Sequence, residues 1–100
     1  MNIFDIPKGD MPKELVGTLL QNKNVRIERI VSKGHTTDWF DQDEDEWLVL
    51  ISGDAKIEFE NDDITLTAGD TMLIPKHQKH RVVKTTECIW LCIFINDELK

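Results

Sequence analysis

The chain has 100 residues, of which 40% are apolar and 31% are charged, as in an ordinary folded soluble protein. Its net charge of -7 and its scattered lysines and arginines argue against nucleic-acid binding. No run approaches the roughly 18 apolar residues of a membrane span, and no signal-peptide pattern opens the chain. We therefore expect a cytoplasmic protein with no membrane partner and, from its length, one domain overall.

Residues 1–24 are predicted to form an N-terminal segment with one short helix. Asp10 or Met11 precedes a proline suited to the first helical position, and Glu14 lies in the first turn, where the helix dipole favours a carboxylate. Four apolar residues then recur at helical spacing: Leu15, Val16, Leu19 and Leu20. The polar residues 21–24 end the predicted helix.

From residue 25 onward the apolar residues alternate with polar ones, which is typical of strands. The predicted strands, in chain order, are residues 25–31, 47–51, 55–60, 64–67, 72–74, 80–84 and 88–95. Short strands at this spacing, separated by glycine turns, predict an all-β barrel or sandwich over residues 25–100. A barrel of this size encloses a cavity that side chains or one small ligand can fill.

Two spacings within this region are distinctive. Glu46 is followed by six residues and then Gly53, and a later segment places Gly69, Pro75 and His80 in a second fixed spacing. Together they resemble the two motifs of the cupin superfamily. The resemblance implies a double-stranded β-helix, also called a jelly-roll barrel, and a homodimer, because cupins of this size often dimerise.

The sequence departs from the cupin pattern at the positions of the metal-binding histidines. The first motif of the family contains a His-x-His pair, and the corresponding positions here hold Phe40 and Gln42 or, with the longer spacing, Trp39 and Asp41. In the second motif, His77 replaces a glycine. Two expected nitrogen ligands are therefore missing.

Gln42, Glu46 and His80 are the candidate metal ligands that the resemblance leaves. One amide oxygen, one carboxylate and one imidazole would suit Fe(II), Mn(II), Ni(II) or Zn(II), with open positions for substrate or water. Two other interpretations of the same residues remain open. Glu46 and His80 could form a buried hydrogen-bonded pair, or they could line a ligand pocket without metal.

Four further residues are candidates for binding a substrate. Arg29 lies among apolar neighbours expected to face inward, where it could bind an anionic group; alternatively, it forms a salt bridge at the rim. Trp39 and Phe40 would line the mouth of the cavity and stack on a planar ligand, or plug the barrel as core. His77 could join the site or simply belong to a turn.

The leading hypothesis is a small cupin that binds a divalent metal and a small organic molecule inside its barrel. The family resemblance implies oxygenase, isomerase or decarboxylase-like chemistry without choosing among them, because a fold does not fix a function. A non-catalytic binding module with a lost metal site is the first alternative. A dimeric structural protein with a filled barrel is the second.

Overall fold

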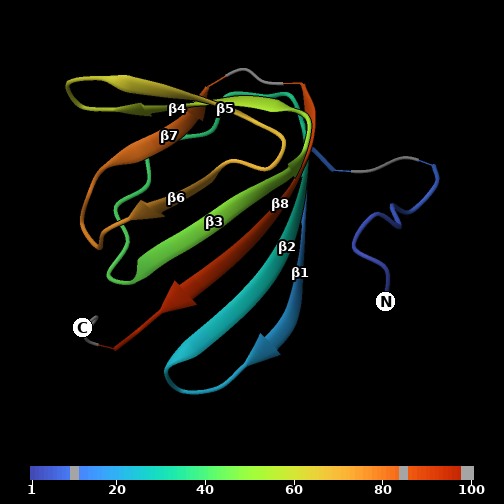
Figure 1. Cartoon of the computed structure of the whole chain (residues 1–100), viewed down its shortest axis with the longest axis horizontal. Coiled ribbons are helices and arrows are strands. Elements are labelled where there is room, and N and C mark those ends of the chain that lie inside the picture. Colours follow the sequence, from blue (N-terminus) through green and yellow to red (C-terminus); the bar gives the residue numbers. More distant parts are fainter. Residues whose placement is uncertain (10–11, 84–85, 98–100) are drawn as a thin grey trace.

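The structure, a computed structural model, describes residues 1–9, 12–83 and 86–97. All regular secondary structure in these residues is β-sheet, as Figure 1 shows. The strands are β1 (Glu14–Gln21), β2 (Val25–Lys33), β3 (Asp45–Ser52), β4 (Asp54–Phe59), β5 (Asp63–Thr67), β6 (Thr71–Ile74), β7 (His80–Val83) and β8 (Glu87–Ile95). The all-β prediction is thereby confirmed. The described residues include no helix that could cross a membrane.

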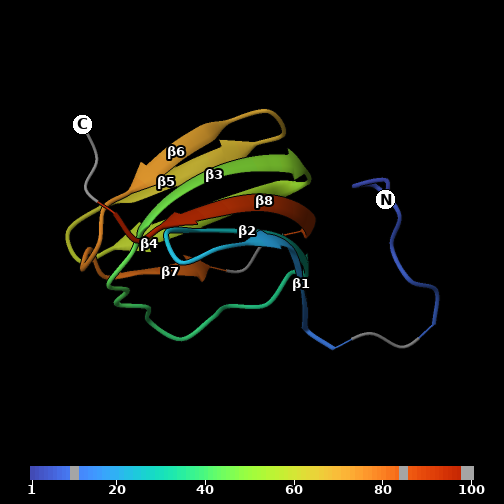
Figure 2. The same ribbon diagram turned by 90° about the horizontal axis from the view of Figure 1, so that it is seen from below.

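The strands form two antiparallel sheets that face each other. The larger sheet has the order β1-β2-β8-β3-β6, and the smaller has the order β5-β4-β7. Figure 2, seen from below, shows β3, β8, β2 and β1 of the larger sheet following one another. Buried side chains from both sheets meet between them, Leu50 and Trp90 from one and Ile57 from the other. The core therefore lies between two sheets rather than under a helix.

The predicted N-terminal helix is wrong, because residues 14–21 form strand β1. This strand pairs with β2, and the register shifts between Thr18 and Leu20, which leaves Leu19 as an extra residue in a bulge. The bulge shifts the alternation of the strand by one residue and so produces the spacing that resembles a helix. Pairing with β2 supplies the backbone hydrogen bonds that a helix would otherwise make. The proposed start of the helix at residues 10 and 11 lies outside the described residues.

The other predicted strands are present, with ends that differ by at most two residues from those expected where the structure describes them. The expected end of one strand at Lys84 lies outside the described residues. Glycine turns occur where expected: Gly53 and Gly69 adopt φ angles of +93° and +95°. Such backbone is strained for any residue with a Cβ, so these glycines fix the turns after β3 and β5.

The outer face of the larger sheet carries an apolar row that we call the outer row. Its members are paired side by side across five strands: Leu20, Ile27, Ile93, Trp47 and Leu73. Leu20, Trp47 and Leu73 are 61%, 37% and 45% exposed. Because each residue faces away from the barrel, this row adds nothing to the core of the chain itself.

Candidate functional site

A cavity of about 180 Å³ lies between the two sheets. Its wall is mainly apolar, with large side chains from both sheets, among them Leu48, Ile57, Ile74, Trp90 and Phe94. Six lining residues are polar or ionisable: Glu14, Glu28, Gln42, Glu46, His80 and Cys92. The cavity reaches the surface beside Val16 and Phe40, which are 48% and 40% exposed. An apolar wall with a few converging polar groups is typical of a small-molecule site.

Glu46 and His80 approach each other inside this cavity. Glu46 belongs to β3 and pairs with Phe94 on β8 and Ile74 on β6, so it shares the inner face of the larger sheet with them. His80 begins β7 and pairs with Phe59 of the smaller sheet. His80 Nε2 lies 3.9 Å from Glu46 Oε1, and both side chains are more than 90% buried. The strands thus bring together two residues from opposite sheets.

Gln42 and Phe40 reach the same cavity from the segment before β3. The backbone of Phe40 donates to His80 O at 2.7 Å, and His80 N donates to Phe40 O at 3.1 Å, which ties this segment to the start of β7. Gln42 Nε2 donates to Glu46 Oε1 at 3.2 Å. The Phe40 ring centre lies 5.6 Å from the His80 ring centre. All three predicted metal ligands therefore lie around one end of the cavity.

The hydrogen bond at the far side of the His80 ring decides which nitrogen carries the proton. Nδ1 lies 3.0 Å from the carbonyl oxygen of Gln78, which can only accept a hydrogen bond. The neutral ring is therefore protonated on Nδ1, and the lone pair is on Nε2, directed into the cavity. Nε2 itself has no hydrogen-bond partner among the described residues, and it lies 3.9 Å from Glu46 Oε1.

Glu46 has an unusual environment for a carboxylate. Burial raises the pKa of Glu46 above its ordinary value, while hydrogen bonds from Cys92 and Gln42 and the nearby His80 act in the opposite direction. Burial and the charge of Glu46 raise the pKa of Cys92 well above its ordinary value. Cys92 therefore remains a thiol that donates to Glu46, and it forms no disulfide.

The side chains around this cavity supply too few ligands to hold a metal ion tightly. Among the residues that the structure describes, no three histidines, cysteines or carboxylates gather in a way that could hold an ion. His80 and Glu46 supply two strong donors, and the amide nitrogen of Gln42, rather than its oxygen, faces Glu46. Catalytic metal sites generally have three protein ligands. With the shorter of the two spacings of the family motif, Phe40 occupies the position of a histidine ligand.

Arg29 does not face the cavity. It pairs with Leu91 of β8, whereas its neighbour Glu28 pairs with Cys92 and lines the cavity, so Arg29 lies on the outer face. Its Nη1 donates to the carbonyl oxygens of Ile3 at 3.3 Å and Asp5 at 2.6 Å. The expected inward orientation is therefore wrong. In the structure this buried arginine attaches the N-terminal segment to the sheet.

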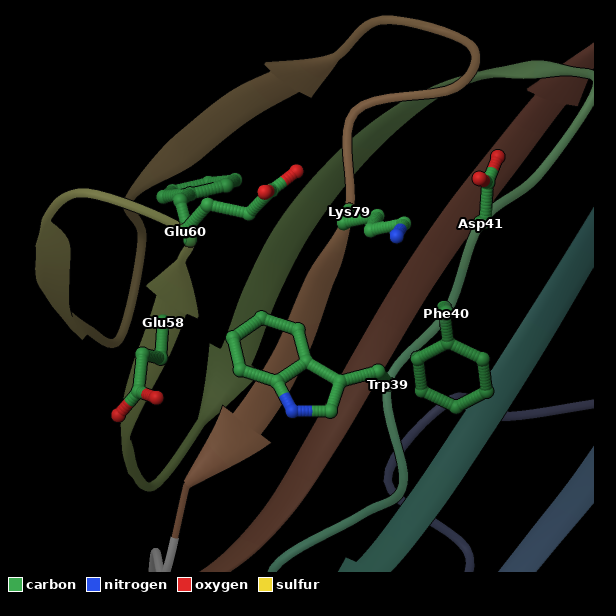
Figure 3. A pocket seen from close by; sticks show the side chains of 7 residues that line it. Trp39, Phe40, Asp41, Glu58, Glu60 and Lys79 are labelled. Carbon is green, nitrogen blue, oxygen red and sulfur yellow. The ribbon is translucent and has the colours of Figure 1, made fainter.

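Trp39 lines a shallow cleft on the outside of the barrel instead of the cavity. Figure 3 shows its ring extending toward Glu58 of β4, with Phe40 on the other side of the loop. The cleft has a volume of about 490 Å³. The guanidinium of Arg81 lies 4.7 Å from the centre of the Trp39 ring and also pairs with Glu58 at 2.8 Å. Phe40 alone among these residues borders both the cleft and the cavity.

The two other histidines lie away from the cavity. His77 has a positive φ of 63°, is 65% exposed at its side chain, and contacts Asp41 at 3.0 Å. It therefore occupies a turn, as one of the two interpretations expected. His35 is half-buried, and its Nδ1 is buried without a partner among the described residues.

Three of the polar or ionisable lining residues were missed by the sequence analysis: Glu14, Glu28 and Cys92. Glu28 and Cys92 pair with each other across β2 and β8, and Cys92 pairs with Leu48 of β3. Alternation along β2 and β8 contains the signal that could have found them. It requires knowing which face of each strand is inside, and the pairing of distant strands determines that.

Comparisons with known proteins agree with this architecture. The family model described as "Cupin domain" matches residues 28–94, which is most of the chain. The chain belongs to the cupin family. A similar solved structure, from Ralstonia eutropha JMP134 and provisionally named a mannose-6-phosphate isomerase, has 37% identity and a TM-score of 0.88, with 97% of each chain covered. None of the curated proteins matches the chain.

More distant structures share the cupin fold. A cupin superfamily protein from Desulfitobacterium hafniense DCB-2 has 22% identity and a TM-score of 0.80, with 91% of this chain and 84% of that chain covered. KdgF from Halomonas sp. has 15% identity and a TM-score of 0.79, with 98% of this chain and 94% of that chain covered. At these identities the likeness concerns the fold alone.

Proposed function

We propose that this cupin binds a small organic molecule inside its barrel, with the polar end of the ligand at Glu46 and His80. The observation that carries the proposal is the cavity of about 180 Å³, whose apolar wall ends at these two buried groups. An apolar cavity of about 150 Å³ admits benzene in another protein. The volume therefore suits a ligand of about six to ten non-hydrogen atoms.

The separation of Glu46 and His80 argues against a purely structural pair. Their closest atoms are 3.9 Å apart, which exceeds the range of about 2.7–3.2 Å for a hydrogen bond to nitrogen. His80 Nε2 is therefore not hydrogen-bonded to Glu46, and it faces the cavity, where it can accept a hydrogen bond from a ligand. A ligand group that lies between the two residues could contact both. This favours an occupied barrel over one filled by its own side chains.

The name of the Ralstonia relative suggests a sugar phosphate, but the lining of this cavity does not suit one. No lysine or arginine is present among the described lining residues, whereas Glu14, Glu28 and Glu46 are. A phosphate would be repelled by these carboxylates and would find no cation to bind. The cavity therefore favours neither a phosphate nor the anionic substrate that was predicted to bind Arg29.

A divalent metal on Gln42, Glu46 and His80 is the second candidate, and one observation favours it. Donation from Nδ1 to a backbone carbonyl is the usual arrangement of a metal-bound histidine, with Nε2 free to bind. Such an ion would supply Lewis-acid chemistry. An ion held by only two strong donors would bind weakly. We therefore propose that the organic ligand binds without the ion.

The proposal can be tested by filling the cavity. Val82 lines it and pairs with Ile57, whereas Val83 is the next residue of β7 and does not line it. Val82→Phe should weaken binding of fragments of six to ten heavy atoms at least tenfold, and Val83→Phe should leave it nearly unchanged. The readout is the NMR shift of the Trp90 indole N–H, which lies in the cavity wall and donates to Ser32.

Thermal unfolding of both variants checks that they fold. Equal fragment binding by the two folded variants would contradict the proposal. The absence of any fragment that shifts the Trp90 signal in the wild-type protein would contradict it as well.

We also propose that the protein forms a homodimer through the outer row, which has no cover among the described residues. A symmetric dimer brings the same patch of both copies together, and a strip of five apolar residues is complementary to itself. Covering Trp47 and Leu73 would also remove large exposed apolar surface from water.

A further inference from the structure

We infer that the cavity ligand is a protonated amine, held by its ammonium group between His80 and Glu46. This inference rests on the proposed function and names the chemical class of the ligand. It follows from the hydrogen-bonding capacity that remains free at the polar end of the cavity, from the charges that line it, and from its aromatic wall.

The polar end of the cavity presents two acceptor atoms to a ligand, His80 Nε2 and Glu46 Oε1. His80 uses its N–H on Gln78 and leaves Nε2 as an acceptor. Gln42 directs its amide N–H at Glu46 Oε1, and the Cys92 thiol also donates to Glu46. The two acceptor atoms are 3.9 Å apart, so a single nitrogen about 2.9 Å from each could donate to both. An ammonium group has three N–H donors and no acceptor, which matches this end.

The charges around the cavity favour a cation. Glu14 and Glu46 line it, and neither has a cationic partner at salt-bridge distance other than His80 among the described residues. Glu28 also lines it and pairs with Arg26 at 3.0 Å. Arg26 is shared with Glu44 at 3.1 Å, so one guanidinium serves two carboxylates. The cavity therefore has an excess of negative charge, which a cationic ligand would neutralise.

Aromatic rings add to this preference. Phe40, Trp90 and Phe94 line the cavity, and the Phe40 ring centre lies 5.6 Å from that of His80. A cation bonded to His80 Nε2 therefore lies near an aromatic ring, and aromatic faces attract ammonium groups. The guanidinium of Arg26 already lies 4.3 Å from the centre of the Phe94 ring, so the lining of this cavity includes a ring that accepts a cation in the folded protein.

Burial of Glu46 points in the same direction. Glu46 is only 6% exposed, and removing a carboxylate from water disfavours its ionised form. A cation next to Glu46 would compensate for the lost hydration. An alcohol of equal size could donate one hydrogen bond but would not compensate for the charge, and a carboxylate would add a second negative charge.

The test compares three probes that share one carbon skeleton: cyclohexylamine, cyclohexanol and cyclohexanecarboxylate. Each is titrated into the full-length protein at pH 7, with affinity measured by calorimetry and location by the NMR shift of the Trp90 indole. The amine should bind at least tenfold more tightly than the alcohol, and the carboxylate should bind most weakly. Glu46→Gln keeps the side-chain shape and removes the charge, so it should reduce the preference for the amine over the alcohol at least tenfold.

Glu44→Gln is the matched control, because Glu44 pairs with Arg26 and does not line the cavity. It should leave the preference for the amine within about threefold of the wild-type value. Equal or tighter binding of the alcohol or the carboxylate would overturn the inference and leave the proposed function intact, as would an amine preference that survives Glu46→Gln. If none of the three probes shifts the Trp90 signal, both the inference and the proposed function fail.

Discussion

His80 Nε2 lies 3.9 Å from Glu46 Oε1, although the two residues are 34 positions apart in the sequence and belong to opposite sheets. A ligand atom between them would connect β3 with β7 and thus one sheet with the other. A ligand that binds only the folded protein stabilises it in proportion to the logarithm of its concentration. The thermal midpoint of unfolding is therefore a convenient measure of binding at this pair.

The buried carboxyl of Glu46 should make the stability depend on pH. Burial raises its pKa, so the folded protein retains this proton at pH values where the unfolded chain has released it. Ionisation of Glu46 therefore destabilises the folded protein. This destabilisation is absent below the pKa of Glu46 in the unfolded chain, grows as the pH rises toward its pKa in the folded protein, and is constant above that pKa. Glu46→Gln removes this ionisation.

The free energy of unfolding of Glu46→Gln relative to wild type should thus increase as the pH rises from 4 to 8. Urea denaturation at fixed pH values across this range measures the difference. A difference that stays constant or decreases would show that Glu46 ionises in the folded protein as readily as in water.

Restoring a histidine in the first motif should create a stronger metal site. Gln42 lies next to Glu46 at 3.2 Å, so Gln42→His would add a third strong donor to those of Glu46 and His80. We expect the affinity for Zn(II) or Ni(II) to rise at least tenfold, and this gain to be lost in the double variant Gln42→His/His80→Ala. Calorimetric titration after removal of bound metal gives the affinities, and Gln42→Leu is the control that adds no donor. An unchanged affinity in Gln42→His would mean that position 42 does not face the site.

Gly53 should be far more sensitive to substitution than Gly69, although both have a positive φ. A Cβ at Gly53 would collide with the backbone oxygen of Glu87 and lie 2.8 Å from Cys88 Sγ, whereas a Cβ at Gly69 would meet nothing within 4 Å. Gly69→Ala should therefore cost about 1–2 kcal/mol from backbone strain alone. Gly53→Ala should cost about 1–3 kcal/mol more because of the overpacking. Chemical denaturation compares the two variants, and equal losses would contradict the packing at Gly53.

The proposed dimer predicts different effects at two exposed tryptophans. Trp47, in the outer row, is 37% exposed, and Trp39, in the outer cleft, is 45% exposed. Trp47→Glu would place a charge in the interface and should shift the protein from dimer to monomer, while Trp39→Glu should leave it dimeric. Sedimentation equilibrium measures the mass of each. A wild-type protein that remains monomeric at 100 µM would rule out this surface as a stable interface.

Most strands could be predicted from the sequence, because alternation and glycine turns are local signals. The failure at residues 14–21 has a local cause, since the extra residue Leu19 breaks the alternation of β1 and no sequence pattern marks a bulge there. Propensity and periodicity alone therefore favoured a helix. Residues 14–21 form a strand because they pair with β2. That strand begins at Val25, beyond the segment whose spacing indicated a helix.

The polar end of the site was predictable only in part. The spacing of Glu46 and His80 identified two groups that the structure brings together, because it follows a family motif. Arg29 shares a face with Ile27 and Val31, as expected, but this face is outside the barrel. Both faces of β2 carry apolar residues, since Val31 is fully buried on the outer face and Ile30 lines the cavity, so the sequence could not identify the inner face.

Phe40 borders the cavity on one side and the outer cleft on the other. Its backbone makes two hydrogen bonds to the backbone of His80, which fix the position of the main chain. Because the residue is 40% exposed, its ring is less restricted. If ligands enter the cavity past Phe40, rotation of its ring sets the rate at which they bind and leave. Replacing Phe40 with alanine would then accelerate both the arrival and the departure of a ligand.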